Sequence, residues 1–150
     1  MRLWHKDLIP YLPRQQLIAQ WRELCCIIKC IARHETPNHI LVNKTLSSRG
    51  DFYAYTQRIL GEMEERGYKV SNSSLTKFTY YFNWSKYCFE TNSTHFNIYP
   101  NWHNDRYLLQ CLANLSEKYD CGGIPEDEWH KIKQAFPEQI KLIYGENINN

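Results

Sequence analysis

The stretch Gln16–Leu24, with the sequence QLIAQWREL, decides how the rest of this chain is interpreted. Apolar residues recur three and four positions apart from here to residue 31, which is the spacing of one helix face. The predicted buried stripe is Leu17, Trp21, Leu24, Ile28 and Ile31. Pro13 suits the first turn of such a helix, and Arg33 suits its last turn, where the helix dipole favours cations. The pattern therefore predicts a long helix near the start of the chain.

When residues are placed around the helix at about 100° per residue, two further faces appear, and they differ in composition. One face carries Gln15, Arg22, Lys29 and Arg33. Its cations form a row that fits either a solvated face or contacts with phosphate groups, and both interpretations stay open.

The third face is less polar than an exposed helix surface normally is. Its residues are Gln16, Ala19, Gln20, Glu23, Cys26, Ile27 and Cys30. Glu23 is the single carboxylate among them. A partly covered acid is usually paired or hydrogen-bonded, so a structural ion pair is the alternative to a catalytic role for Glu23.

Length and composition place limits on the class of protein. The chain has 150 residues, 43% hydrophobic and 23% charged, which fits one globular domain over residues 1–150. The net charge of +2 is too small to indicate nucleic-acid binding by itself. We expect a cytoplasmic protein without a membrane partner, because the sequence has neither a signal-peptide pattern nor a run of about 20 apolar residues. None of the six cysteines has CxxC spacing, so we expect no metal and no cofactor.

Helix start and stop signals outline the rest of an all-α fold. Asp51 and Gly67 bracket a predicted helix over 52–66, and Asn104 precedes one over 105–119. Pro125 and Pro137 open two more. We predict a loop over 35–50 and a mostly irregular, aromatic-rich stretch over 71–103. The expected fold is a compact single-domain helical protein with a long N-terminal helix and irregular aromatic-rich loops.

Two segments carry a resemblance to a known family. These are Met1-Arg2-Leu3 and the stretch Gln16–Leu24, supported more loosely by Gln57–Ile59 and Glu65–Tyr68. The sequence resembles the pyrimidine-dimer DNA glycosylases of the phage endonuclease V type, and its opening resembles a bacterial branch of that family. The likeness covers the first third of the chain well and the second predicted helix loosely.

The resemblance implies a glycosylase with AP lyase activity on pyrimidine dimers or related base damage in double-stranded DNA. By position, the nucleophile is the α-amine of Met1, which forms a Schiff base with C1′ of the damaged nucleotide, and Glu23 assists it. Arg2 and Arg22 match arginines that contact DNA. Gln16 stands where the family has a histidine, and Cys26 stands where it has an arginine. The predicted DNA-binding residues are Arg2, Arg22, Gln16, Lys29 and Arg33, and the protein is expected to act as a monomer.

This chemistry is physically reasonable. An α-amino group has a reference pKa of about 7.7–8.0, against about 10.4 for lysine, so more of it is neutral and nucleophilic near pH 7. Glu23 could move protons and stabilise a cationic sugar or imine. Extruding a nucleotide costs least where its base is damaged. We therefore expect the terminal amine in a cleft beside Glu23.

Two other functions remain open from the sequence. One is a non-catalytic helical module that binds nucleic acid or protein. The other is a lyase that acts only on abasic sites, because the changes at Gln16 and Cys26 concern lesion capture more than imine chemistry. The aromatic cluster Phe78–Phe89, with Lys77 and Lys86, is either a packed loop or a substitute for the aromatic tail of the phage enzyme.

Overall fold

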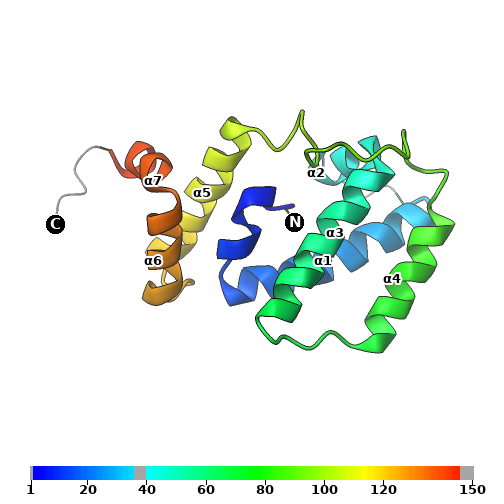
Figure 1. Cartoon of the computed structure of the whole chain (residues 1–150), viewed down its shortest axis with the longest axis horizontal. Helices are drawn as coiled ribbons and strands as arrows, with labels where there is room; N and C mark the ends of the chain where they lie inside the picture. The colour runs from blue at the N-terminus through cyan, green and yellow to red at the C-terminus, as the bar shows by residue number, and fades with distance from the viewer. Residues whose placement is uncertain (1, 36–39, 146–150) are drawn as a thin grey trace.

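The computed structural model describes residues 2–35 and 40–145, and within these ranges every regular element is a helix (Figure 1). The elements in chain order are η1 (Lys6–Tyr11), α1 (Arg14–Ala32), α2 (Ile40–Asn43), η2 (Lys44–Ser47), α3 (Arg49–Glu65), α4 (Asn72–Trp84), α5 (Asp105–Asp120), α6 (Glu126–Ala135) and α7 (Pro137–Tyr144). The predicted all-α class is confirmed. None of the described helices is both long enough and apolar enough to cross a bilayer.

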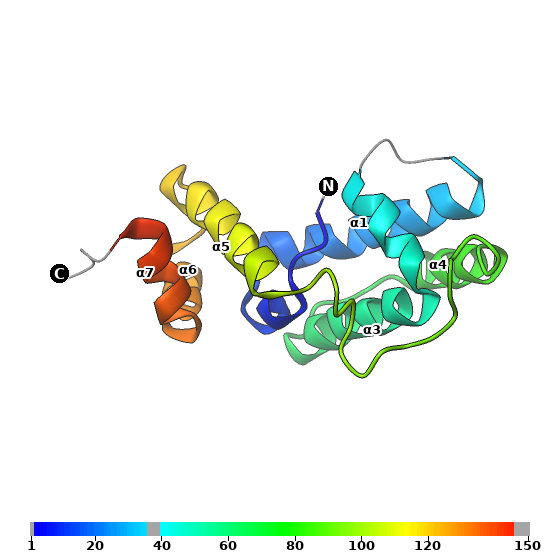
Figure 2. The same cartoon turned by 90° about the horizontal axis from the view of Figure 1, so that it is seen from above.

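The N-terminal segment occupies the middle of the molecule. Helix α1 packs against α3 and α4 on one side, whereas α5, α6 and α7 form the other side. Both views place the segment that leads into η1 between α5 and the α1–α3 pair (Figures 1 and 2). Leu3, Trp4, Leu8 and Ile9 are buried there, and the predicted stripe of α1 is buried as well. The segment that begins at Leu3 is thus part of the hydrophobic core.

Several helix ends follow the predicted signals. The Asn104 side chain accepts a hydrogen bond from the Tyr107 amide at 3.0 Å, so it caps α5 as expected. Gly67 has φ 72° and ends α3, with the Tyr68 amide donating to the Met63 carbonyl at 2.8 Å. This helix ending needs one residue in the left-handed backbone conformation, which glycine adopts without a Cβ clash. Gly122, with φ 75°, ends α5 in the same way.

Two predicted loops contain helices. The stretch 71–103 was predicted to be mostly irregular, and this is wrong for Asn72–Trp84, which is α4. Aromatic residues occupy both the buried and the exposed side of α4, which hides the helical period in the sequence. Likewise, the predicted loop over 35–50 holds α2 and η2. Residues 85–104 contain no helix or strand, as expected.

Asp51 does not cap α3. The helix begins two residues earlier, and Ser48 accepts the capping bond from the Asp51 amide at 3.1 Å. The Asp51 carboxylate is buried and instead accepts the His95 amide at 3.0 Å and faces His95 Nδ1 at 2.6 Å. Asp51 therefore ties the long 85–104 segment to the first turn of α3.

Two buried histidines make stability depend on pH. His103 is 3% exposed and stacks on His5 with ring centroids 5.2 Å apart. Burial, together with the nearby His5 and Lys6, lowers the pKa of His103 from 6.5 to about 3. Burial also lowers the pKa of His5. Because the unfolded chain takes up protons below pH 6.5 while the folded chain does not, stability is greatest above pH 6.5 and falls as the pH drops toward 3.

We expect the free energy of unfolding in urea to fall by about 2 kcal/mol between pH 7 and pH 5 through His103 alone. His103→Gln keeps an acceptor for the Lys6 amide, which His103 Nδ1 binds at 2.9 Å, but removes the titration. The variant should therefore show a flatter dependence over this range. An equal slope in both proteins would exclude His103 as the source.

Candidate active site

The backbone of residues 2–4 is held against α1 by two acceptors. The Arg2 amide donates to Glu23 Oε2 at 3.4 Å, and the Trp4 amide donates to Gln20 Oε1 at 2.8 Å. Gln20 and Glu23 lie three residues apart on α1 and so share one face. Gln20 Nε2 also donates to Glu23 Oε2 at 3.2 Å, which fixes the carboxylate relative to the helix. Glu23 thus faces the start of the chain.

Helix α3 contributes Tyr55 to this arrangement. The Tyr55 hydroxyl lies 2.8 Å from the Trp4 carbonyl oxygen and 3.0 Å from Gln20 Oε1, and these two acceptors share its one proton. Tyr55 is completely buried, and burial raises its pKa well above the ordinary value. The hydroxyl therefore keeps its proton and acts as a donor. Gln20, also completely buried, bonds to both the chain start and α3.

Helix α5 holds the opposite edge of the same backbone. The Tyr107 hydroxyl donates to the Leu3 carbonyl at 2.5 Å. Burial raises the pKa of Tyr107, so this group also remains a donor. Arg2 lies beside α5, because it lines a cleft together with Asn114 and Lys118 of that helix. Residues of α1, α3 and α5 thus hydrogen-bond to the backbone of residues 2–4. We call the contacts made by Glu23, Gln20, Tyr55 and Tyr107 the N-terminal clamp.

A cleft of about 390 Å³ opens beside the clamp. Its lining residues are Arg2, Trp4, Gln16, Ala19, Glu23, Asn114 and Lys118. Two cations and one carboxylate face this space, and the Arg2 guanidinium lies 5.9 Å from the centre of the Trp4 ring. A cleft of this size with mostly polar walls fits a polar, anionic ligand such as a sugar phosphate better than an apolar one.

Comparison with known proteins assigns a family to the chain. A sequence model of the pyrimidine dimer DNA glycosylase family matches residues 1–76. The chain belongs to this family. The family is one of DNA glycosylases, which are DNA repair enzymes, and its substrate is therefore DNA. No curated protein and no solved structure matches the chain. Glu23, Gln20 and Tyr55 lie inside the part that the glycosylase family model covers, whereas Tyr107, Asn114 and Lys118 lie beyond it.

The residues predicted for a glycosylase site are distributed over more than one surface. Arg2, Gln16 and Glu23 line the clamp cleft. Arg22 points about 100° away from Glu23 around α1 and lines a different cleft of about 510 Å³ with Arg14 and Lys69.

The other predicted residues are more distant from Glu23 along the chain. Lys29 and Arg33 are exposed on α1, and the Arg33 guanidinium lies 5.9 Å from the centre of the Tyr81 ring. Met1 lies outside the described residues. Gln16 has a buried Oε1 without a hydrogen-bond partner among the described residues.

Sequence reasoning assigned no role to several residues of this site. Gln20, Tyr55 and Tyr107 hold the chain start, and Asn114 and Lys118 line the cleft. One available signal was the spacing of Cys111, Asn114 and Lys118, which places them on one face of α5. That spacing indicates a shared face but not what the face meets.

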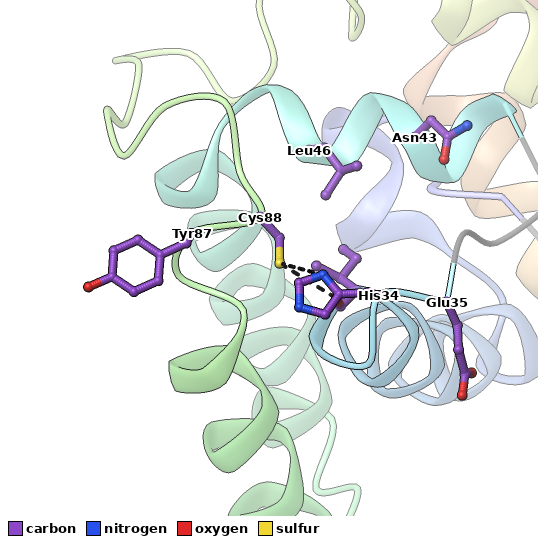
Figure 3. Close-up of a pocket in the computed structure, with 7 residues that line it drawn as sticks. His34, Glu35, Asn43, Leu46, Tyr87 and Cys88 are labelled. Carbon is purple, nitrogen blue, oxygen red and sulfur yellow. Dashed lines mark hydrogen bonds between the residues drawn. The ribbon is translucent and has the colours of Figure 1, made fainter.

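A third cavity contains a thiol and an imidazole. It measures about 320 Å³ and lies at the C-terminal end of α1 (Figure 3). The Cys88 thiol donates to the Ile31 carbonyl at 3.6 Å and lies 3.9 Å from His34 Nδ1. Glu35 points away from His34, so neither group has a carboxylate to activate it among the residues drawn. Across the described residues, no group of three or more His, Cys, Asp or Glu could hold a metal ion.

Proposed function

We propose that this protein is a DNA glycosylase with AP lyase activity that acts on pyrimidine dimers or related base damage. The α-amine of Met1 is the proposed nucleophile. The observation that carries this proposal is the 3.4 Å hydrogen bond from the Arg2 amide to Glu23 Oε2. Met1 is joined to that amide by a peptide bond, and the clamp fixes the backbone that follows. The family match to the first half of the chain supports the same assignment.

The proposed reaction begins with the neutral amine. Its nitrogen adds to C1′ of the damaged nucleotide as the bond from C1′ to the base breaks, and the base leaves with the electron pair and takes up a proton. The amine loses a proton, the C1′–O4′ bond opens, and O4′ gains a proton. The product is a protonated Schiff base. Loss of a C2′ proton then breaks the C3′–O bond and releases the phosphate-bearing strand.

Glu23 has two roles in this proposal. Its carboxylate accepts the proton released by the amine and returns it to O4′, and its negative charge stabilises the cationic sugar and imine. The hydrogen bond from Gln20 Nε2 at 3.2 Å orients the carboxylate for these roles. Because the clamp already fixes residues 2–4, little reorganisation is needed when DNA binds.

The cations provide the proposed DNA contacts. Arg2 and Lys118 in the clamp cleft bind phosphates next to the extruded nucleotide, and Gln16 offers its amide to the same nucleotide. Arg22, Lys29 and Arg33 meet the phosphate backbone farther along α1. One hydrophobic core includes residues from both ends of the chain, which supports a single domain over 1–150. We propose that it works as a cytoplasmic monomer.

A lyase that acts only on abasic sites is the second candidate. Gln16 places an amide in the clamp cleft where the family has an imidazole. Cys26 is an exposed thiol at the position where the family has a positively charged arginine. Both differences concern recognition of the lesion and leave the amine and Glu23 unchanged. Substrate choice separates the two functions.

The decisive experiment is borohydride trapping on duplex DNA that carries either a pyrimidine dimer or an abasic site. Protein with a free Met1 amine should form a covalent adduct with both substrates. Protein with an N-terminal extension or an acetylated Met1 should form none, because its nitrogen no longer carries a nucleophilic lone pair. Binding to undamaged duplex should persist in the blocked protein.

Each other outcome has a clear meaning. An adduct with abasic DNA alone would establish the second candidate. If neither substrate is trapped by protein whose free amine is verified by mass spectrometry, the enzymatic proposal fails and a binding module remains. An equally strong adduct in the acetylated protein would move the nucleophile to a lysine, of which Lys118 is the one in the clamp cleft.

A further inference from the structure

Helix α4 exposes an aromatic face. Phe78 and Phe82 point into the core and stack with ring centroids 6.0 Å apart. Lys77, Tyr80, Tyr81 and Trp84 are spaced i, i+3, i+4 and i+7 and so form one stripe on another side of the helix. The outer side of an amphipathic helix normally carries charged and polar residues. Tyr81 is partly buried and packs against the core, so it is the exposed rings of Tyr80 and Trp84 that need another explanation.

Two rings of the stripe are accessible. Tyr80 is 51% exposed and Trp84 is 67% exposed. Tyr80 contacts both Tyr81 and Trp84, with centroid distances of 5.3 and 5.4 Å. Figure 1 shows that α4 lies at one end of the molecule, away from α5–α7. A contiguous exposed aromatic surface of this kind is typical of a binding site.

Three cations, Lys77, Arg33 and Lys86, lie on or next to the stripe, and Arg33 also pairs with Glu35 at 4.0 Å. Helix α4 contains Lys77 and no acidic residue. The Arg33 guanidinium lies over the Tyr81 ring and is 3.5 Å from its hydroxyl. Just beyond the helix, the Lys86 ammonium lies 4.6 Å from the centre of the Tyr87 ring, which is 86% exposed. The ligand of this surface should therefore combine flat aromatic groups with negative charge.

We propose that the exposed face of α4 is a stacking platform for unpaired bases of a nucleic-acid strand. Aromatic side chains next to cations are how proteins bind single strands without sequence preference: bases stack on the rings and phosphates meet the cations. In a duplex the base faces are occupied by their neighbours, so an intact double helix fits the platform less well. The cationic row of α1 reaches the platform at Arg33, so one strand could contact both. This inference goes beyond the glycosylase chemistry and does not depend on it.

Fluorescence of Trp84 tests the platform directly. The other four tryptophans are no more than 7% exposed, but Trp4 and Trp21 line the clefts that contain Arg2 and Arg22. The quenching that Trp84→Phe loses is therefore the part that reports on Trp84. Undamaged oligo(dT) should quench the emission of the full chain, and a duplex of equal length should quench it less. Trp84→Ala, measured by anisotropy of a labelled oligo(dT), should bind about tenfold more weakly. Trp84→Phe keeps a ring and should retain most of the affinity.

Leu142→Ala is the matched control, because Leu142 is 73% exposed on α7 and has no ring or cation stacked on it among the described contacts. Its affinity should equal that of the parent chain. Unchanged affinity in folded Trp84→Ala would overturn the platform. A different result would also overturn it: the parent chain binds no oligonucleotide but self-associates in sedimentation, and Trp84→Ala abolishes the self-association. The face would then be a protein interface. Protein with an acetylated Met1 should bind oligo(dT) normally. The glycosylase proposal and the platform proposal can therefore fail independently of each other.

Discussion

Glu23→Gln should fold and bind duplex DNA like the parent chain but form the borohydride-trapped adduct about 10²–10⁴ times more slowly. Glutamine has nearly the same shape, and its amide oxygen can still accept the Arg2 amide that Glu23 accepts at 3.4 Å. The amide cannot take the proton that the amine must lose, and it carries no charge to stabilise the imine. The loss should therefore appear in the chemical step under single-turnover conditions with saturating enzyme.

A matched control removes a carboxylate elsewhere. Glu65→Gln makes the same charge change on the exposed side of α3 and should form the adduct at the parental rate. Anisotropy on abasic duplex should give similar affinities for all three proteins. Parental turnover by Glu23→Gln would remove Glu23 from the mechanism and leave its bond to the chain start as a purely structural contact.

Gln20→Leu should lower both stability and activity. The substitution leaves the Trp4 amide buried without its 2.8 Å acceptor and takes away one acceptor of the Tyr55 hydroxyl. Losing a partner of a buried polar group costs about 1–3 kcal/mol, so we expect a decrease of this size in the free energy of unfolding. Because the clamp then holds residues 2–4 less firmly, adduct formation by the folded protein should also slow, by about tenfold or more.

Urea unfolding and trapping on abasic duplex, both at 25 °C, measure the two effects separately. Gln110→Leu is the control, since Gln110 is exposed on α5. Tyr55→Phe provides an intermediate case, because it loses the donor but leaves the Trp4 amide paired with Gln20. If folded Gln20→Leu traps DNA at the parental rate, the clamp is not needed to position the amine.

Helices whose signals are local could be predicted from the sequence. The apolar stripe of α1 and the cap of α5 by Asn104 depend on residues within a turn or two, and the structure has both. Helix α4 was missed because Phe78 and Phe82 face the core while Tyr80 and Trp84 face outward. A periodicity argument cannot separate two faces that use the same residue type. The displaced start of α3 has a different cause, since Asp51 is drawn into contact with His95, 44 residues away in sequence.

The candidate site likewise combines features with local sequence signals and features set by distant contacts. Glu23 stood out because it is the single carboxylate on a weakly polar helix face, and the resemblance pointed to the chain start as its partner. The residues that hold that start could not be found in this way. Tyr55 and Tyr107 reach Trp4 and Leu3 across 51 and 104 residues of sequence, and nothing local to either tyrosine indicates such a contact. These two contacts are determined by tertiary packing alone.

The bond from Tyr107 to Leu3 also has a consequence for biosynthesis. The Leu3 carbonyl is made early in synthesis, but the Tyr107 hydroxyl that donates to it is made 104 residues later. At about 5–20 residues per second, the ribosome needs about 5–20 s to reach Tyr107. During that time the nascent chain carries its amino terminus without the full clamp around it. For the Met1 nucleophile proposed above, chemical competence should thus arise late in synthesis, once α5 has emerged and Tyr107 can bond to Leu3.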